Sequence, residues 1–370
     1  MPVTSPRSPD PGRLAVTVQA KLPFSSTLSN IVPLPGDASN RRYFRLGLNG
    51  ERASVILMQL ASPEAFKQSE EAVTGSVTIT ELPFINVLGH LAKADVPVPA
   101  LYYFDAEAGL LYLQDFGDLT LVRAYQDGPA ATQRELYREA IQILVQMQLR
   151  ASTPDPSCLA FTRGFDVPLL MWEFDHFLEY GVEARHGAPI RAQDREVVRA
   201  EFQKISEWMA AQPRVFTHRD YHSRNLMVRP DPARWRLGVI DFQDALLGPA
   251  TYDLASLLRD AYIELEEPLI EELIDYYREL MMAASKGSPV ETGRSPLMER
   301  QEFRRLFDYT SIQRNLKAAG RFVYIDRVKQ NPSFLRDIPR TLGYVRRNLS
   351  KYPELGSLRT HLAPYVPELQ

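Results

Sequence analysis

The spacing of apolar and polar positions predicts a strand-rich first third and a mostly helical remainder. Short apolar or alternating runs, typical of strands, lie at residues 41–46, 54–60, 96–104 and 109–115. Helical spacing lies at residues 13–28, 83–93, 132–149, 169–180 and 196–211. The expected fold class is therefore α+β, with a small antiparallel sheet followed by a larger helical part that contains residues 282–297 as a mobile connection.

Two later apolar runs each lead into acidic and amide side chains. Residues 215–228 and 237–244 predict buried strands that present polar groups at their ends. Asp220 could accept a proton, while Asn225 and Asp241 offer the oxygen ligands that Mg²⁺ requires. Phosphoryl transfer uses such a set, since a carboxylate orients the attacking hydroxyl and an Asn/Asp pair holds the metal on ATP. The alternative, in which Asp220 and Asn225 only cap turns, stays open.

The complete ordered set resembles the aminoglycoside phosphotransferase and choline kinase superfamily, relatives of the protein kinases. The motifs H-x-D-x-x-x-x-N, I-D and G-x-x-x-x-D are here His218, Asp220, Asn225, Ile240, Asp241, Gly248 and Asp253. The resemblance implies a protein-kinase-like bilobal fold and the cofactors ATP and Mg²⁺. It implies that Asp220 is catalytic, that Asn225 and Asp241 bind the metal, and that His218, His222 and Asp253 support the catalytic loop.

The implied domains are a disordered leader at residues 1–12, a nucleotide-covering N-lobe at 13–115 and a C-lobe at 116–370. A Gly/Ser/Asn loop at residues 36–40 could bring backbone N–H groups to phosphate, although an ordinary hairpin would look the same. Gln114 and Phe116 are expected at the hinge between the lobes, where kinases bind adenine.

One feature departs from the family pattern. The third N-lobe strand of kinase-like folds presents a lysine to the phosphates, paired with a helix glutamate, whereas Met58 occupies that position here. The helix at 83–93 contains no acidic residue, and Glu81 lies just ahead of it. Arg41, Arg42 and Arg45 are the candidates to supply phosphate charge instead.

Longer stretches resemble the bacterial anomeric sugar kinases that act on N-acetylmuramate and N-acetylglucosamine. They include residues 36–45, 218–227, 239–245, 248–254 and 313–322. The resemblance implies phosphorylation of the sugar C1 hydroxyl, giving a sugar 1-phosphate for peptidoglycan recycling. The candidates to bind the amino sugar are Arg224, Arg259, Arg314, Lys317 and Arg321. An aminoglycoside or amino-alcohol kinase and a pseudokinase-like binding module remain alternatives.

Composition excludes several other classes. The chain has 370 residues, of which 45% are hydrophobic, and a net charge of −3, so nothing favours nucleic acid as a partner. Its one cysteine, Cys158, excludes an internal disulfide. Since no signal-peptide core or membrane-length apolar run occurs, no membrane partner and a cytoplasmic location are expected.

Residues 314–351 carry ten Lys/Arg against two Asp, for which a solvated face is the simplest interpretation. The oligomeric state is open, and a monomer is plausible.

Overall fold

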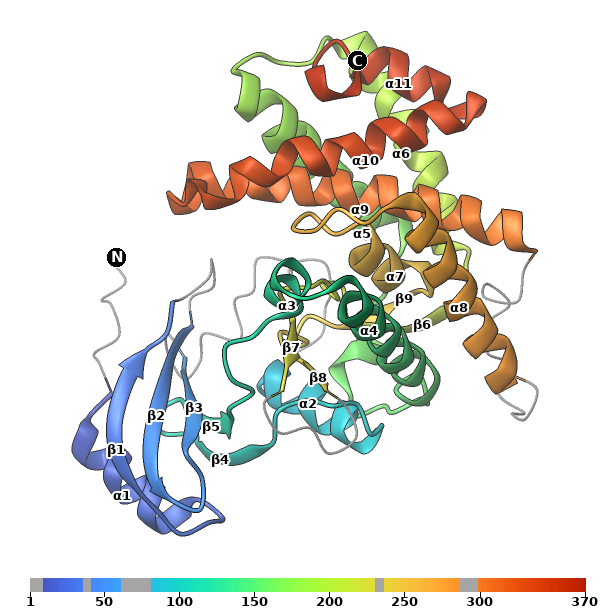
Figure 1. Cartoon of the computed structure of the whole chain (residues 1–370). Coiled ribbons are helices and arrows are strands. Elements are labelled where there is room, and N and C mark those ends of the chain that lie inside the picture. Colours follow the sequence, from blue (N-terminus) through green and yellow to red (C-terminus); the bar gives the residue numbers. More distant parts are fainter. Residues whose placement is uncertain (1–8, 36–40, 61–80, 230–235, 286–298) are drawn as a thin grey trace. The chain divides into compact units, whose positions relative to one another are not determined.

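The computed structural model describes residues 9–35, 41–60, 81–229, 236–285 and 299–370. They form two compact units, one made of the residues up to Leu82 with Val98–Asp118, the other of Pro83–Pro97 with Leu119–Gln370. The first unit contains an antiparallel sheet and the second is mostly helical, which confirms the expected fold class (Figure 1).

The first unit is a five-stranded sheet with one helix beside it. Its elements are α1 (Pro11–Lys21), β1 (Ser26–Pro33), β2 (Arg42–Gly50), β3 (Ser54–Gln59), β4 (Leu101–Asp105) and β5 (Leu110–Gln114). The strand order is β1-β2-β3-β5-β4, and each neighbouring pair is antiparallel. Leu14 and Val18 of α1 pack with Phe44, Leu57 and Tyr112 of the sheet in one buried core. Burial alternates along β2, whose buried residues share this core with α1, so α1 covers the apolar face of the sheet.

Two sequence predictions for this unit were wrong. The helix predicted at residues 13–28 begins at Pro11, inside the predicted leader, and ends at Lys21, where Pro23 prevents continuation. Residues 26–33 form the edge strand β1 instead. The strand predicted at 96–104 begins only at Leu101, because Pro97 and Pro99 cannot donate to a ladder.

The second unit contains two short hairpin-like strand pairs among helices. Its helices are α2 (Pro83–Lys93), α3 (Leu121–Asp127), α4 (Ala130–Arg150), α5 (Val167–His176), α6 (Ala192–Ala210), α7 (Thr251–Leu258), α8 (Glu267–Ser285), α9 (Arg300–Lys329), α10 (Ile338–Lys351) and α11 (Gly356–Leu362). Shorter turns are η3 (Leu159–Thr162), the π-helix η4 (Phe177–Ala184), η6 (Pro332–Asp337), η7 (Pro353–Leu355) and η8 (Pro367–Leu369). Strand β6 (Arg214–Thr217) pairs with β9 (Leu246–Pro249), and β7 (Leu226–Val228) pairs with β8 (Leu237–Val239), both antiparallel. The helices predicted at 83–93, 132–149, 169–180 and 196–211 are confirmed, with shifted ends.

Helix α2 belongs to the second unit, although the sequence placed it in the N-lobe. Asn86 donates from Nδ2 to the Ser157 carbonyl and accepts from the Leu159 N–H. His90 is buried and bonds through Nε2 to the Ala151 carbonyl at 2.7 Å. These contacts fix α2 to the segment that follows α4. Of the connection predicted at 282–297, residues 282–285 end α8 and the remainder lies outside the described residues.

The long helix α9 runs through the second unit and is buried over much of its length (Figure 1). It contacts η4 backbone to backbone at Gly320, where an added Cβ would lie 2.8 Å from Phe177 Cα. Arg314 of α9 is only 4% exposed, so the solvated-face interpretation of the basic segment is wrong at this residue.

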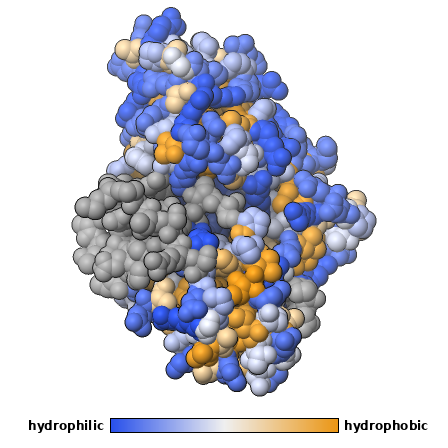
Figure 2. Space-filling view, turned by 90° about the vertical axis from the view of Figure 1, so that its left-hand side faces the viewer, coloured by the Kyte–Doolittle hydropathy of each residue, from blue (hydrophilic) through white to orange (hydrophobic). Residues whose placement is uncertain are grey.

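The exposed surface carries few large apolar side chains. Among the described residues, those exposed are Val16, Val32, Leu119, Trp172 and Val328, which lie on separate elements. Figure 2 shows one face, on which hydrophilic residues dominate and hydrophobic residues gather toward the bottom of the view. No described helix is long and apolar enough to cross a membrane.

Candidate active site

The loop between β6 and β7 is held by two buried carboxylates. Asp253, in the first turn of α7, accepts the backbone N–H groups of His218 at 2.6 Å and Arg219 at 3.0 Å. Asp260, just after α7, accepts the N–H of Ser223 at 2.8 Å. Burial raises the pKa of Asp253 to about 6. Each carboxylate supplies acceptors for donors that the tight loop cannot satisfy itself.

Asp220 lies in this loop with its carboxylate beside two cations. The side chain is 41% exposed, and its Oδ1 is 3.7 Å from Arg314 Nη2 and 3.8 Å from Lys317 Nζ. Burial raises the pKa of Asp220, but the charges of Lys317 and Arg314 outweigh burial and hold it below the usual range. The group is therefore an ionised acceptor that is open to a ligand.

Asn225 and Asp241 meet beside Asp220. Asn225 Nδ2 donates to the Asp220 carbonyl at 3.0 Å and lies 3.5 Å from Asp241 Oδ2. Gln243 Nε2 donates to Asp241 Oδ1 at 2.9 Å. One amide oxygen and one carboxylate fit Mg²⁺, which usually takes one or two protein oxygens and completes its shell with water and phosphate. Within the described residues, no cluster of three or more His, Cys, Asp or Glu side chains could hold a metal alone.

The backbone is left-handed at two residues of the site. Arg219 has φ of 77° and Asp241 has φ of 64°. For residues with a Cβ this conformation costs about 1–2 kcal/mol each. Strain of this kind persists only where the surroundings impose it, and it is concentrated at functional sites. The contacts of Asp253 with His218 and Arg219 are such a constraint.

Sequence reasoning missed the buried network under the loop. Glu173 of α5 is fully buried and accepts from Arg219 Nη2 at 2.9 Å and from Gln313 Nε2 at 2.7 Å. Arg314 Nε donates to Ser256 Oγ, which in turn donates to the Arg219 carbonyl at 3.4 Å. The sequence did carry a signal: Glu173 lies among apolar residues of a helix, and a buried Glu requires a partner.

The two histidines of the loop have different surroundings. His218 bonds through Nε2 to the Ile240 carbonyl at 2.9 Å, and its Nδ1 accepts the Asp220 N–H at 3.3 Å. The His222 ring meets the Tyr262 ring edge to face at 5.2 Å. Burial lowers the pKa of His222 to about 4, so the ring is neutral near pH 7. These contacts are those expected of residues that support the loop, and that role stays a prediction.

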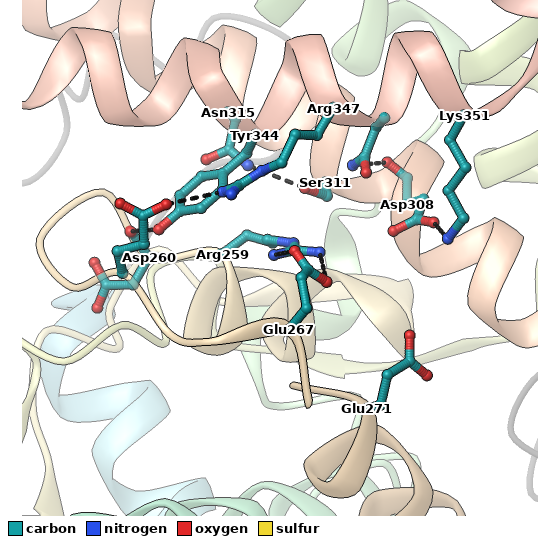
Figure 3. Close-up of polar contacts among 12 residues, drawn as sticks. Arg259, Asp260, Glu267, Glu271, Asp308, Ser311, Asn315, Tyr344, Arg347 and Lys351 are labelled. Atoms are coloured by element: carbon teal, nitrogen blue, oxygen red, sulfur yellow. Dashed lines mark hydrogen bonds and ion pairs between the residues drawn. The ribbon is translucent and has the colours of Figure 1, made fainter. Parts of the chain in front are cut away.

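The predicted sugar-binding cations separate into groups. Arg314 and Lys317 lie at Asp220, whereas Arg321 stacks over Tyr324 at 4.6 Å. Figure 3 shows Arg259 paired with Glu267, at 2.6 and 2.9 Å. In the same view Asp308 pairs with Lys351, so the first pair joins the end of α7 to α8 and the second joins α9 to α10. The contacts of Arg259 are structural ones.

In the first unit, the candidates for nucleotide contact have unequal partners. Arg45 donates from Nε to Asp115 at 2.6 Å and from Nη1 to Asp118 at 2.9 Å. Arg42 lies over the Phe44 ring at 5.1 Å, and Arg41 is half-buried. The two carboxylates therefore neutralise Arg45.

The remaining predictions for this unit concern the missing lysine, the hinge and the loop. Met58 is buried in β3, opposite Tyr43 and Leu111. Gln114 Oε1 accepts the N–H of Ala100 at 3.3 Å, and Phe116 is buried. The phosphate loop predicted at residues 36–40 lies outside the described residues.

Curated relatives match almost the whole chain. A protein of Neisseria meningitidis serogroup B named N-acetylmuramate/N-acetylglucosamine kinase is 33% identical over 331 residues, 89% of each chain. A protein of the same name from Pseudomonas aeruginosa is 31% identical over 340 residues, covering 90% of this chain and 88% of the relative.

Solved structures share the fold at low identity. Choline kinase from Cryptosporidium parvum superposes with a TM-score of 0.59 at 11% identity, covering 94% of this chain and 98% of its own. An ADP-bound aminoglycoside phosphotransferase gives 0.56 at 12% identity, covering 90% and 96%. Residues 30–287 match the family described as "Phosphotransferase enzyme family". The fold, the loop motif and these matches show that the chain belongs to this phosphotransferase family.

Proposed function

We propose that this chain is an ATP-dependent kinase that phosphorylates the anomeric C1 hydroxyl of N-acetylmuramate and N-acetylglucosamine. The observation that carries the proposal is the match to kinases named for these two sugars over about nine-tenths of the chain. The meeting of Asp220, Asn225 and Asp241 at one loop supports phosphoryl transfer as the chemistry. The sugar 1-phosphates formed would serve peptidoglycan recycling in the cytoplasm.

In this proposal Asp220 receives the acceptor hydroxyl. Its carboxylate is partly exposed and ionised, so it can accept a hydrogen bond from the C1 hydroxyl and orient the oxygen for attack. The Asp220 anion can also take the proton as the oxygen becomes bonded to phosphorus. Arg314 and Lys317 fix the position of the carboxylate through its Oδ1.

The cofactor roles fall to residues of both units. Asn225 and Asp241 would hold Mg²⁺, which when bound neutralises charge on the phosphates of ATP. Arg41, Arg42 or Arg45 would add positive charge on the phosphates in place of the missing lysine. The segment with Gln114 and Phe116 would bind adenine.

A product analysis tests the proposal. The purified chain with ATP and Mg²⁺ is supplied separately with each sugar, and ³¹P NMR is expected to show a phosphate coupled to the anomeric proton. A phosphate on another hydroxyl would overturn the anomeric assignment, and phosphorylation of aminoglycosides alone would overturn the substrate class. ATP binding without phosphoryl transfer to any substrate would favour a pseudokinase-like binding module, the alternative suggested by Met58 at the lysine position.

A further inference from the structure

Arg224 stands on the candidate catalytic loop, four residues beyond Asp220, with its guanidinium flat against aromatic rings. Its Cζ lies 3.6 Å from the centroid of Tyr262 and 5.3 Å from that of Phe334. The side chain is half-buried. Among the described residues, no carboxylate lies within ion-pair distance of Arg224, whereas Arg219, Arg259 and Arg314 of the same unit each pair with one.

Three neighbouring rings from three segments form a platform near Arg224, with the planes of Tyr262 and Phe322 tilted by 47° to one another. Tyr262 follows α7, Phe322 belongs to α9 and Phe334 to η6. Phe322 and Phe334 stack at 5.6 Å with an interplanar angle of 15°, and Tyr262 lies 6.2 Å from Phe322. Packing against the rings restricts the orientation of the guanidinium. Its edge can then offer two parallel N–H donors to one planar anion.

Buried polar atoms without partners lie around this platform. They are His222 Nδ1, against Tyr262, and Asp337 Oδ2, at the end of the turn that carries Phe334. Burial raises the pKa of Asp337, and the charge of Arg224 lowers it. A buried polar atom that stays unpaired is unfavourable, and such atoms are uncommon in native structures.

The platform is also close to Asp220. His222 lies two residues after Asp220 and contacts Tyr262 at 5.2 Å. Burial raises the pKa of Tyr262, and the charges of Arg224 and Asp220 both act on the same phenol. A ligand on the platform would therefore lie against the loop that carries Asp220.

We propose that Arg224 binds the carboxylate of N-acetylmuramate, while Tyr262 and Phe334 hold its guanidinium in place. The inference rests on the proposed function. It names the residue that binds the lactyl carboxylate, which N-acetylmuramate has and N-acetylglucosamine lacks. The cations of α9 are less suited, since Arg314 and Lys317 already face Asp220.

The test compares three substrates within each enzyme preparation. Values of kcat/KM are measured for N-acetylmuramate, its neutral methyl ester and N-acetylglucosamine with wild type, Arg224→Gln, Arg224→Lys and Arg321→Gln. Arg327→Gln, at an exposed position on α9 whose ion-pair partner is Asp326, is the matched control. Ratios between substrates are independent of the fraction of active protein, so a partly unfolded variant cannot imitate the effect.

In Arg224→Gln, the preference for the acid over its methyl ester should fall about tenfold or more from the wild-type value. Arg224→Lys keeps the charge but loses the planar fork, so its preference for the acid should lie between those of wild type and Arg224→Gln. If Arg224→Gln is inactive, the preference measured in Arg224→Lys tests the proposal. Equal losses on all three substrates in both variants, or a selective loss only in Arg321→Gln, would overturn the subsite alone. Wild-type protein that phosphorylates neither sugar would overturn the proposed function and the subsite with it.

Discussion

Two parts of the chain carry the residues expected to meet ATP, and they differ in how their charges are partnered. In the second unit, Asp253 and Asp260 fix the loop that carries Asp220 by accepting its backbone donors. In the first unit, Met58 stands where kinase-like folds have a lysine, and Arg45 forms ion pairs with Asp115 and Asp118.

The two units therefore differ in how firmly their candidate residues are held before substrate binds. The loop that carries the proposed acceptor and metal residues is preorganised by buried hydrogen bonds, so little ordering should remain when substrate binds. The arginines proposed to contact the phosphates are instead half-buried residues near the start of β2, where solvent weakens each contact. Substitutions in the loop should therefore cost far more than substitutions in the first unit.

The largest effect is expected at Asp220. General-base assistance is typically worth about 10² to 10⁴ in rate, so Asp220→Asn should lower kcat by that factor while ATP binding is preserved. Steady-state kinetics and calorimetric titration with ATP measure both quantities, with Asp326→Asn on α9 as the control. A kcat close to wild type would remove Asp220 from the chemistry.

A second test concerns the carboxylate that holds the loop. Burial raises the pKa of Asp253 to about 6, above the ordinary value of about 3.9. Its contribution to stability is therefore fully present below about pH 4 and is lost as pH rises through 6. Over that window wild type should lose up to about 3 kcal/mol relative to Asp253→Asn, at about 1.4 kcal/mol per pKa unit.

Urea unfolding at several pH values between 4 and 7 measures this difference. The Asn side chain cannot accept at both positions, so the variant should also be less active at every pH. Parallel stability curves for the two proteins would show that Asp253 has an ordinary pKa.

The two metal-ligand candidates should differ in magnitude. Asp241→Ala removes a charged oxygen and should raise the Mg²⁺ concentration at half-maximal rate about tenfold or more, equivalent to about 1.4 kcal/mol. Asn225→Ala removes a neutral oxygen and should have a smaller effect. An unchanged Mg²⁺ titration in the Asp241 variant would contradict the assignment.

The smallest effect is expected in the first unit. Arg41→Ala or Arg42→Ala should raise KM for ATP about two- to fivefold, since a solvent-screened pair is worth at most about 1 kcal/mol. Arg52→Ala, at an exposed position between β2 and β3, is the control. A loss of several hundredfold in either variant would mean that the first unit contributes as much to activity as the loop does.

The sequence predicted the loop well because its chemistry is local. His218, Asp220 and Asn225 occur within eight residues after β6, and Asp241 follows the partner of β7, so strand pairing alone brings them together. The approach of Arg314 and Lys317 to Asp220 could not be predicted. Helical periodicity identifies a buried face but not the segment that it packs against. The basic segment that contains Arg314 was expected to form a solvated face, whereas Arg314 is buried against Ser256.

The backbone contact at Gly320 makes α9 a means of altering the site from a distance. A side chain can repack around an added methyl group, but the main chain of Phe177 lies where the Cβ of an alanine would go. Gly320→Ala must therefore move a helix rather than a rotamer, and Lys317 lies one turn away on that helix. The substitution offers protein engineers a way to shift the cations against Asp220 without changing any charged group.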